Sequence, residues 1–390
     1  MLNRRHVLAS LGGAPFVVPL VASVAPFDLV AIEGARVMRA VSAYAKSPIR
    51  TITAIAAPRS PATRHDYYSE ADYWWPDPAH PGGPHVRRDG FSNPAKFDGH
   101  RDALIRFGIE MPALATAWFV SRRPHFALRA AAHLRAWFVD PATRMNPDLS
   151  HAQAIIGVNT GRAIGIIDTL QIVEVACAAH LLARHDAPGY AAIRRGVDRW
   201  FREYLDWLTG SAAGRQERDQ RNNHGSCWLL QVAAFGALVG NDEALRDART
   251  RLVDQIIPTQ IATDGSQPLE LARTKPYGYS LFNLDVLAGA CRLLSIKGHL
   301  WRFQTADGRS VAKATAFMAP FIRDKALWPY TKDVEHFADF PVRHPSLLFA
   351  GQALDRPDWL ALWRRLDPDP RVAEVIRNFP IRQPLLWPEE

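Results

Sequence analysis

Residues 227–256 read CWLLQVAAFGALVGNDEALRDARTRLVDQI, and this stretch contains the pattern that decides the fold. Apolar residues recur at spacings of three and four over 227–239 and again over 243–256, which is the period of an α-helix. Gly240 stands between the two runs, where a helix is expected to end. The stretch therefore predicts two consecutive helices joined by a short turn.

The same periodicity recurs over most of the chain. Helices are expected in six further segments: 102–120, 125–139, 164–184, 190–208, 281–296 and 312–322. Prolines and glycines fall where several of these helices should end. No segment alternates apolar and polar residues over a useful length, so few strands are expected.

The helices follow one another as antiparallel pairs that repeat about every 40 to 50 residues. Two all-α arrangements accommodate such pairs: an open solenoid, and a ring of helical hairpins called an α/α toroid, with a groove at one end. The helices differ in length, and the long loops carry the unusual residues. These features favour the toroid, which we expect to occupy residues 26–390 as one domain.

The segment from about 50 to 100 has a different character, because proline, glycine, aromatic and charged residues are dense in it. Such a composition excludes a regular helix. Long loops in compact domains are usually functional or disordered, and the aromatic content argues against disorder. We therefore expect an ordered segment that covers a site.

Residues 1–25 read MLNRRHVLASLGGAPFVVPLVASVA, with two arginines, an apolar stretch and then small residues. This order is typical of a secretory signal, and Arg4-Arg5 resembles the twin-arginine type. We expect export to the periplasm or the medium. No later run approaches the roughly 18 unbroken apolar residues of a membrane span, so stable membrane insertion is not expected.

The chain is basic, with 47 Lys and Arg against 39 Asp and Glu among 390 residues, a formal charge of +8. Without the signal segment the balance is 45 − 39 = +6. Such a charge suits nucleic acids, anionic membranes or acidic polymers. No run of five or more basic residues and no DNA-binding motif is present, so nucleic acid is not expected as a partner. The 12 tryptophans suit sugar rings, and an anionic polysaccharide is the expected ligand.

Metal chemistry is not indicated by the sequence. The three cysteines, Cys177, Cys227 and Cys291, are widely separated and show none of the Cys/His spacings that hold zinc. Their odd number also argues against a disulfide framework. We expect buried, inert thiols and no cofactor.

Two segments carry residues suited to acid–base chemistry. The first, RNNHG at 221–225, places Asn223 and His224 at a helix entrance; a structural helix cap is the alternative interpretation. The second, LELARTKPYGYS at 269–280, places Arg273, Tyr277 and Tyr279 together. A tyrosine with a pKa near 10 can donate a proton unaided, and it acts as a base if a neighbouring cation such as Arg273 lowers that pKa.

These groups suit the β-elimination of a uronic acid polymer, in which the C5 proton is removed and the oxygen at C4 is expelled. Asn223, His224 and Arg273 would offset the substrate carboxylate and the charge that develops. A tyrosine or histidine would take the proton, and a tyrosine would protonate the leaving oxygen. A glycoside hydrolase on a helical toroid is an alternative, and it would need two facing carboxyl groups. The candidate acids are Glu70, Asp72, Asp77, Asp89 and Glu270.

Six stretches of the chain together resemble the alginate lyase domain family over roughly residues 50–330. They are YYSEADYWWPDP (67–78), VRRDG (86–90), AWFVDPATRMNPDL (136–149), GRAIGIIDT (161–169), NNHG (222–225) and YGYSLFNL (277–284). The resemblance implies a polysaccharide lyase with an incomplete α/α toroid that cleaves polyuronates. It also implies four catalytic residues: Asn223, His224, Arg273 and Tyr279. The first two stretches resemble the branch that includes glucuronan-degrading lyases, so the expected substrate is either alginate or polymannuronate, or else glucuronan.

Further residues are expected to bind substrate. Trp74 and Trp75 would stack on sugar faces, and Arg87 or Arg88 would pair with carboxylates. The remaining candidates are Gln153 and Arg162, expected to line the groove, and Tyr277, a second phenol beside Tyr279. A protein that binds or guides an anionic exopolysaccharide during export, without catalysis, is the second alternative to a lyase.

Overall fold

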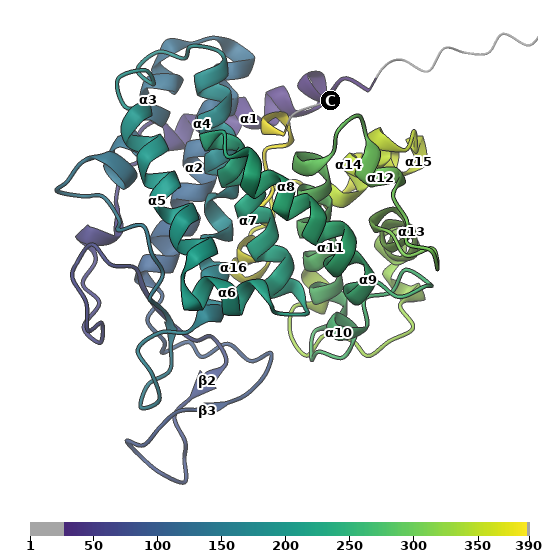
Figure 1. The fold of residues 1–390 in the computed structure, drawn as a ribbon, viewed down its shortest axis with the longest axis horizontal. Helices are drawn as coiled ribbons and strands as arrows, with labels where there is room; N and C mark the ends of the chain where they lie inside the picture. The colour runs from purple at the N-terminus through teal and green to yellow at the C-terminus, as the bar shows by residue number, and fades with distance from the viewer. Residues whose placement is uncertain (1–26, 388–390) are drawn as a thin grey trace, which may run out of the picture.

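The computed structural model describes residues 27–387, and most of them lie in helices (Figure 1). The first half holds α1 (Leu29–Tyr44), α2 (Gly99–Ser121), α3 (Pro124–Leu134), α4 (Val173–Arg184), α5 (Arg194–Gly210) and α6 (Ala212–Arg218). The second half holds α7 (Asn223–Val239), α8 (Asp242–Arg251), α9 (Ile257–Gln260), α10 (Pro268–Leu271), α11 (Pro276–Leu294), α12 (His299–Arg302), α13 (Val311–Arg323), α14 (Pro345–Ala353), α15 (Pro357–Arg365) and α16 (Ala373–Arg377). The predicted export signal, 1–25, lies outside the described residues.

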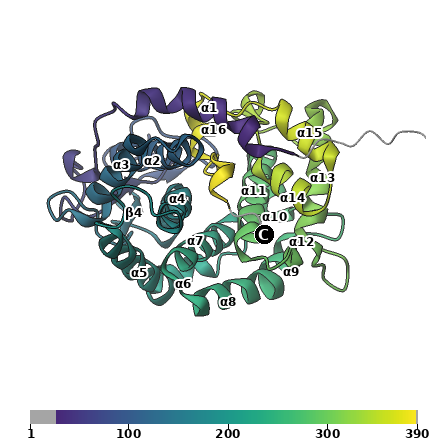
Figure 2. The ribbon, with the colours of Figure 1, turned by 90° about the horizontal axis from the view of Figure 1, so that it is seen from above.

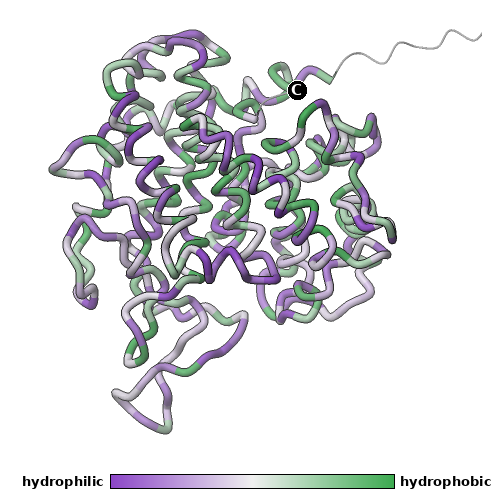
Figure 3. Tube along the Cα trace, viewed as in Figure 1, coloured by the Kyte–Doolittle hydropathy of each residue, from purple (hydrophilic) through white to green (hydrophobic). Residues whose placement is uncertain are grey.

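The helices form an incomplete ring of hairpins, so the predicted α/α toroid is confirmed (Figure 2). Helices α4, α7 and α11 pack against one another in sequence around its interior, while α5 and α8 lie at the outside. Helix α7 is buried on nearly all sides because its apolar residues occupy every face. The outer helix α8 is largely hydrophilic and buries only Ala248 (Figure 3).

The predicted turn between 227–239 and 243–256 has the expected chemistry. Gly240 ends α7 in the left-handed conformation, with φ of 69°, and the side chain of Asn241 caps the start of α8 by accepting from the backbone amide of Ala244. Three predicted helices change type along their length. Residues Ala163–Ile172 form a 3₁₀ helix before α4, and two π-helical turns, Arg135–Val139 and Leu252–Ile256, follow α3 and α8.

Helix α1 connects the two ends of the incomplete ring. It packs on α2 and on the C-terminal segment, and in Figure 2 it runs across one side of the molecule. Arg36 of α1 contacts Asp369 at 3.0 Å, and Glu33 accepts a hydrogen bond of 2.7 Å from Arg343. These partly buried ion pairs tie the N-terminal helix to residues more than 300 positions away.

The few strands belong mainly to the segment from 50 to 100. Strand β1 (Tyr68–Glu70) pairs in parallel with β4 (His151–Ala154), and β2 (Trp74–Trp75) pairs in antiparallel fashion with β3 (Val86–Arg87). The β2–β3 hairpin extends beyond the helices at the lower end in Figure 1. These pairings order the aromatic segment and place it across the end of the ring where α7 and α11 begin.

By length and composition, two helices, α2 and the helical stretch Ala163–Arg184, would be able to cross a membrane. However, 72% and 78% of their most apolar windows are buried inside the protein. Their apolar residues belong to the core. The three cysteines are buried and unpaired within it.

Candidate active site

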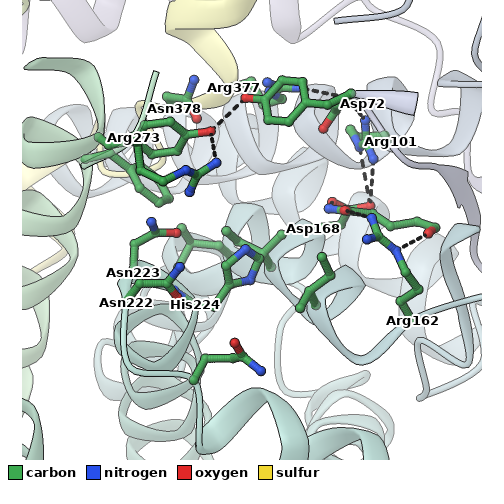
Figure 4. Close-up of a pocket in the computed structure, with 18 of the residues that line it drawn as sticks. Asp72, Arg101, Arg162, Asp168, Asn222, Asn223, His224, Arg273, Arg377 and Asn378 are labelled. Carbon is green, nitrogen blue, oxygen red and sulfur yellow. Dashed lines mark hydrogen bonds and ion pairs between the residues drawn. The ribbon is translucent and has the colours of Figure 1, made fainter. Parts of the chain in front are cut away.

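A cavity of about 290 Å³ opens at the end of the ring where α7 and α11 begin (Figure 4). Its walls come from the aromatic segment, from the stretch around β4, from the starts of α7 and α11, and from the C-terminal segment. Eight of the eleven residues expected from the sequence line it: Trp74, Arg87, Gln153, Arg162, Asn223, His224, Arg273 and Tyr279. Distant parts of the chain thus meet at one site.

Asn223 and His224 are held by two buried carboxylates. The backbone amide and Nδ2 of Asn223 each donate a 2.7 Å hydrogen bond to Glu270. Nδ1 of His224 lies 2.7 Å from Oε1 of Glu217, which has no exposed surface. With Nδ1 directed at a carboxylate, Nε2 of His224 is left for the cavity and is able to accept a proton.

Tyr279 lies between a cation and a second phenol. Nη2 of Arg273 donates a 2.8 Å hydrogen bond to the Tyr279 hydroxyl, and the hydroxyl of Tyr73 lies 2.9 Å away. Asp89 in turn contacts Arg273 at 3.1 Å and accepts a hydrogen bond from Thr274 at 3.0 Å. The phenol is therefore fixed in position.

The surroundings of Tyr279 favour the protonated form of its hydroxyl. Burial raises the pKa of the Tyr279 hydroxyl well above 10, and Tyr73 adds to the effect. Arg273 acts in the opposite direction but does not outweigh burial. Arg273 is the cation that would have to lower this pKa for Tyr279 to act as a base. Because burial outweighs it, the phenol is held protonated at neutral pH, which suits a proton donor.

Three expected residues lie outside the cavity. Tyr277 points into the core: its ring is fully buried and its hydroxyl donates to the carbonyl of Phe321 at 3.0 Å. The expectation that Tyr277 contacts substrate is therefore wrong. Tyr277 and Tyr279 are two residues apart on α11, so their side chains point in different directions. Trp75 and Arg88 stack on each other on the hairpin, with Arg88 Cζ 5.1 Å from the ring centroid. They do not line the cavity.

The cavity also contains residues that sequence reasoning missed. Tyr73 lies in the stretch 67–78, but no local feature of the sequence marks it as a partner of Tyr279. Arg377 and Asn378 come from the C-terminal segment, for which the sequence suggested no role. Arg377 contacts Asp72 at 2.7 Å and so links this segment to the aromatic one.

Each carboxylate that lines the cavity forms an ion pair with an arginine. Within residues 27–387 these are Asp72 and Asp168, which Arg101 contacts at 2.6 and 3.3 Å. Glu270 is buried against Asn223. A pair of free carboxyl groups facing each other, as a hydrolase requires, is not found among these residues.

The described residues contain no group of three or more His, Cys, Asp or Glu side chains placed to hold a metal ion. The histidine–carboxylate contact at His344 is structural: its Nδ1 lies 2.7 Å from Asp285, and both side chains are buried beneath the start of α14.

The alginate lyase family model matches residues 51–328 of this chain. The solved structure of an alginate lyase from Bacteroides ovatus superposes with a TM-score of 0.77 and 28% sequence identity, covering 87% of this chain and 90% of that one. Alginate lyase A1-III from Sphingomonas species A1 is similar in fold, with a TM-score of 0.50, 16% identity and coverage of 80% and 84%. Among curated proteins, none matches the sequence.

Proposed function

This chain belongs to the alginate lyase family and is a polysaccharide lyase, and from that premise we propose that it cleaves a 1,4-linked polyuronate in the cavity described above. The substrate is either alginate or polymannuronate, or else glucuronan. The observation that supports this site is the convergence of Asn223, His224, Arg273 and Tyr279 around one cavity.

The first task of the site is to make the C5 proton removable. That proton is barely acidic while the neighbouring carboxylate carries its charge. Arg273 supplies a cation, and Asn223 has a second Nδ2 hydrogen besides the one given to Glu270. Donors fixed before the reaction stabilise the enolate-like state without having to reorganise.

The second task is proton transfer. We assign Tyr279 as the acid that protonates the oxygen leaving C4, because its environment holds the phenol protonated. Nε2 of His224 is the base for a substrate whose C5 proton and C4 oxygen lie on opposite faces of the sugar. When both lie on one face, Tyr279 serves both steps: its proton first goes to solvent base, and the phenolate then takes the C5 proton and passes it to the C4 oxygen as the C4–O bond breaks.

The test is a substrate panel of alginate, polymannuronate and glucuronan. Cleavage by elimination yields an unsaturated uronate, so ultraviolet absorbance should rise together with reducing ends. Tyr279→Phe should nearly abolish this absorbance on every active substrate. New reducing ends without absorbance would overturn the proposal in favour of hydrolysis, and binding without cleavage would favour a guiding protein.

We also propose export of the protein to the periplasm or the medium, on the basis of residues 1–25. Replacing Arg4 and Arg5 with lysine should retain the protein in the cytoplasm. Fractionation of cells that express the two forms measures this directly, and an unchanged distribution would contradict it.

A further inference from the structure

The arginines that line the cavity differ in whether they contact a carboxylate directly. Four form ion pairs: Arg87 and Arg273 with Asp89, Arg101 with Asp72, Asp98 and Asp168, and Arg377 with Asp72 and Glu374. The fifth, Arg162, forms no ion pair with any residue between 27 and 387. Arg162 is thus a cation in the cavity whose charge the protein leaves available.

A neutral side chain holds Arg162 in place. Its Nε donates a 2.9 Å hydrogen bond to the backbone carbonyl of Gln153, and its Nη2 donates to Oε1 of the same residue at 3.1 Å. These two neutral acceptors fix one edge of the guanidinium without cancelling the charge, whereas a carboxylate at position 153 would cancel it. Within the described part of the chain, Nη1 of Arg162 has no hydrogen-bond partner, so this edge remains for a ligand.

Gln153 is itself held in a strained conformation. Its φ of 51° lies in the left-handed region, which a residue other than glycine rarely adopts. Three residues hold this conformation. The backbone amide of Gln153 donates to Ser69 Oγ at 2.8 Å, its Nε2 donates to Asp168 Oδ1 at 3.2 Å, and its two oxygens accept from Arg162. Such strain recurs at ligand clamps, where the surrounding structure over-determines one side chain.

The free charge of Arg162 is unfavourable in the absence of an anion. Burial lowers the pKa of the Arg162 guanidinium to about 10, the charge of Arg87 contributes, and the more distant carboxylates of Asp168, Asp72 and Glu217 offset this only in part. The group still carries its proton at neutral pH, because that pKa lies well above 7. A partly buried cation that contacts no carboxylate directly gains from binding an anion, because the anion adds the close contact that the protein does not supply.

The position of Arg162 separates it from the reacting groups. Figure 4 shows Arg162 and Arg273 at opposite ends of the cavity, with His224 between them. Cζ of Arg162 lies 5.9 Å from the ring centroid of Trp74, which also lines the cavity. One end of the cavity therefore offers a cation and an aromatic face side by side, which suits an acidic sugar.

We propose that Arg162 binds the carboxylate of a uronate next to the one that reacts, and that Gln153 is the positioning residue that keeps Arg162 oriented and uncompensated. The inference rests on the proposed function, because it assigns a second carboxylate of the same polymer. It implies that the protein recognises an acidic chain at a sugar where no bond is broken.

Steady-state kinetics on the preferred polyuronate test this inference. Arg162→Gln should raise KM by about tenfold or more, since a charged hydrogen bond is lost, while kcat stays within about twofold. Gln153→Glu should produce a similar rise in KM, because the new carboxylate neutralises Arg162. The double variant should be little worse than either single variant, since both remove one available charge. Arg162→Lys keeps the charge and should recover part of the lost affinity.

Two matched controls change the charge elsewhere. Arg195 on α5 and Gln216 on α6 are exposed and lie outside the cavity, so Arg195→Gln and Gln216→Glu should leave KM unchanged. In the Tyr279→Phe background, Arg162→Gln should also weaken calorimetric binding of a trimeric uronate, but not of its carboxyl-reduced, neutral analogue. An active parent whose KM is unaffected by Arg162→Gln would overturn this inference alone. A parent that produces no unsaturated uronate would overturn the proposed function.

Discussion

The hydroxyl of Tyr73 lies 2.9 Å from the hydroxyl of Tyr279, although the two residues are 206 positions apart in the chain. Arg273 contacts the same Tyr279 hydroxyl at 2.8 Å. The phenol that we assign as the acid therefore has a cation and a second phenol as hydrogen-bonding neighbours. These neighbours influence its pKa in opposite directions, and burial decides the balance.

Tyr73→Phe should move the alkaline limit of activity to lower pH. Tyr73 contributes to the raised pKa of Tyr279, so its removal lowers that pKa. An acid must be protonated to act, and activity is lost as the pH rises through its pKa; a lower pKa brings this loss to a lower pH. The pH profile of kcat/KM measures the shift. A limit that is unchanged or moves upward would contradict the assigned acid.

Tyr279→Phe should impair catalysis, whereas Tyr277→Phe should impair only stability. Removing the Tyr279 hydroxyl should lower kcat by about 100-fold or more, because a positioned acid is lost. Removing the Tyr277 hydroxyl breaks one buried hydrogen bond to Phe321 and should cost about 1 kcal/mol of unfolding free energy, with kcat unchanged. Kinetics and urea unfolding of both variants separate the two roles. A large fall in kcat for Tyr277→Phe would instead show that the Tyr277 hydroxyl takes part in catalysis.

Glu217→Gln should impair catalysis through His224. The carboxylate lies 2.7 Å from Nδ1 of His224 and fixes which nitrogen faces the cavity. An amide is able to accept the same hydrogen bond but also to rotate and donate, so the orientation is less well defined. For a substrate that uses His224 as base, kcat should fall by about tenfold, less than for His224→Ala. Equal activity of Glu217→Gln and the parent would remove Glu217 from the mechanism.

The helices could be predicted because their signals are local. Apolar spacing and Gly240 lie within the stretch that they shape, so 227–256 was sufficient for a hairpin. Helices α1, α14 and α15 were missed. Asp28 caps α1, and Pro345 and Pro357 stand at the first positions of α14 and α15. The last two have only nine residues each, too few for a clear period, whereas α1 is long enough to show one.

Some residues of the site also have a local signal in the sequence, and others do not. Asn223 and His224 are adjacent, and Tyr279 follows Arg273 closely, so the sequence places each pair without knowledge of the fold. Tyr73 and Arg377 reach the cavity only through tertiary structure, and no local pattern reports that. The error at Tyr277 has a similar cause, since the face of α11 that meets the core depends on its neighbours.

Asp72 connects the aromatic segment to the floor of the cavity and should make stability depend on acidic pH. Burial alone would raise the pKa of its carboxyl, but the charges of Arg101, Arg377 and Lys96 outweigh burial and hold the pKa well below its usual range. Asp72→Asn at pH 7 should therefore lower the unfolding free energy by about 3 kcal/mol. This is the low end of the usual cost of breaking a buried ion pair, because Arg101 keeps its contact with Asp168.

The sign of the pH effect follows from the lowered pKa of Asp72. A carboxyl whose pKa is depressed on folding contributes its full stability above its unfolded pKa, about 3.9, and loses that contribution as pH falls toward the folded pKa. Urea unfolding of the parent and Asp72→Asn should thus differ most near neutral pH, and the difference should shrink below about pH 4. Asp206→Asn, an exposed residue on α5, should match the parent at every pH. If the gap between parent and Asp72→Asn stayed constant into the acid range, Asp72 would act through shape and hydrogen bonding and not through its charge.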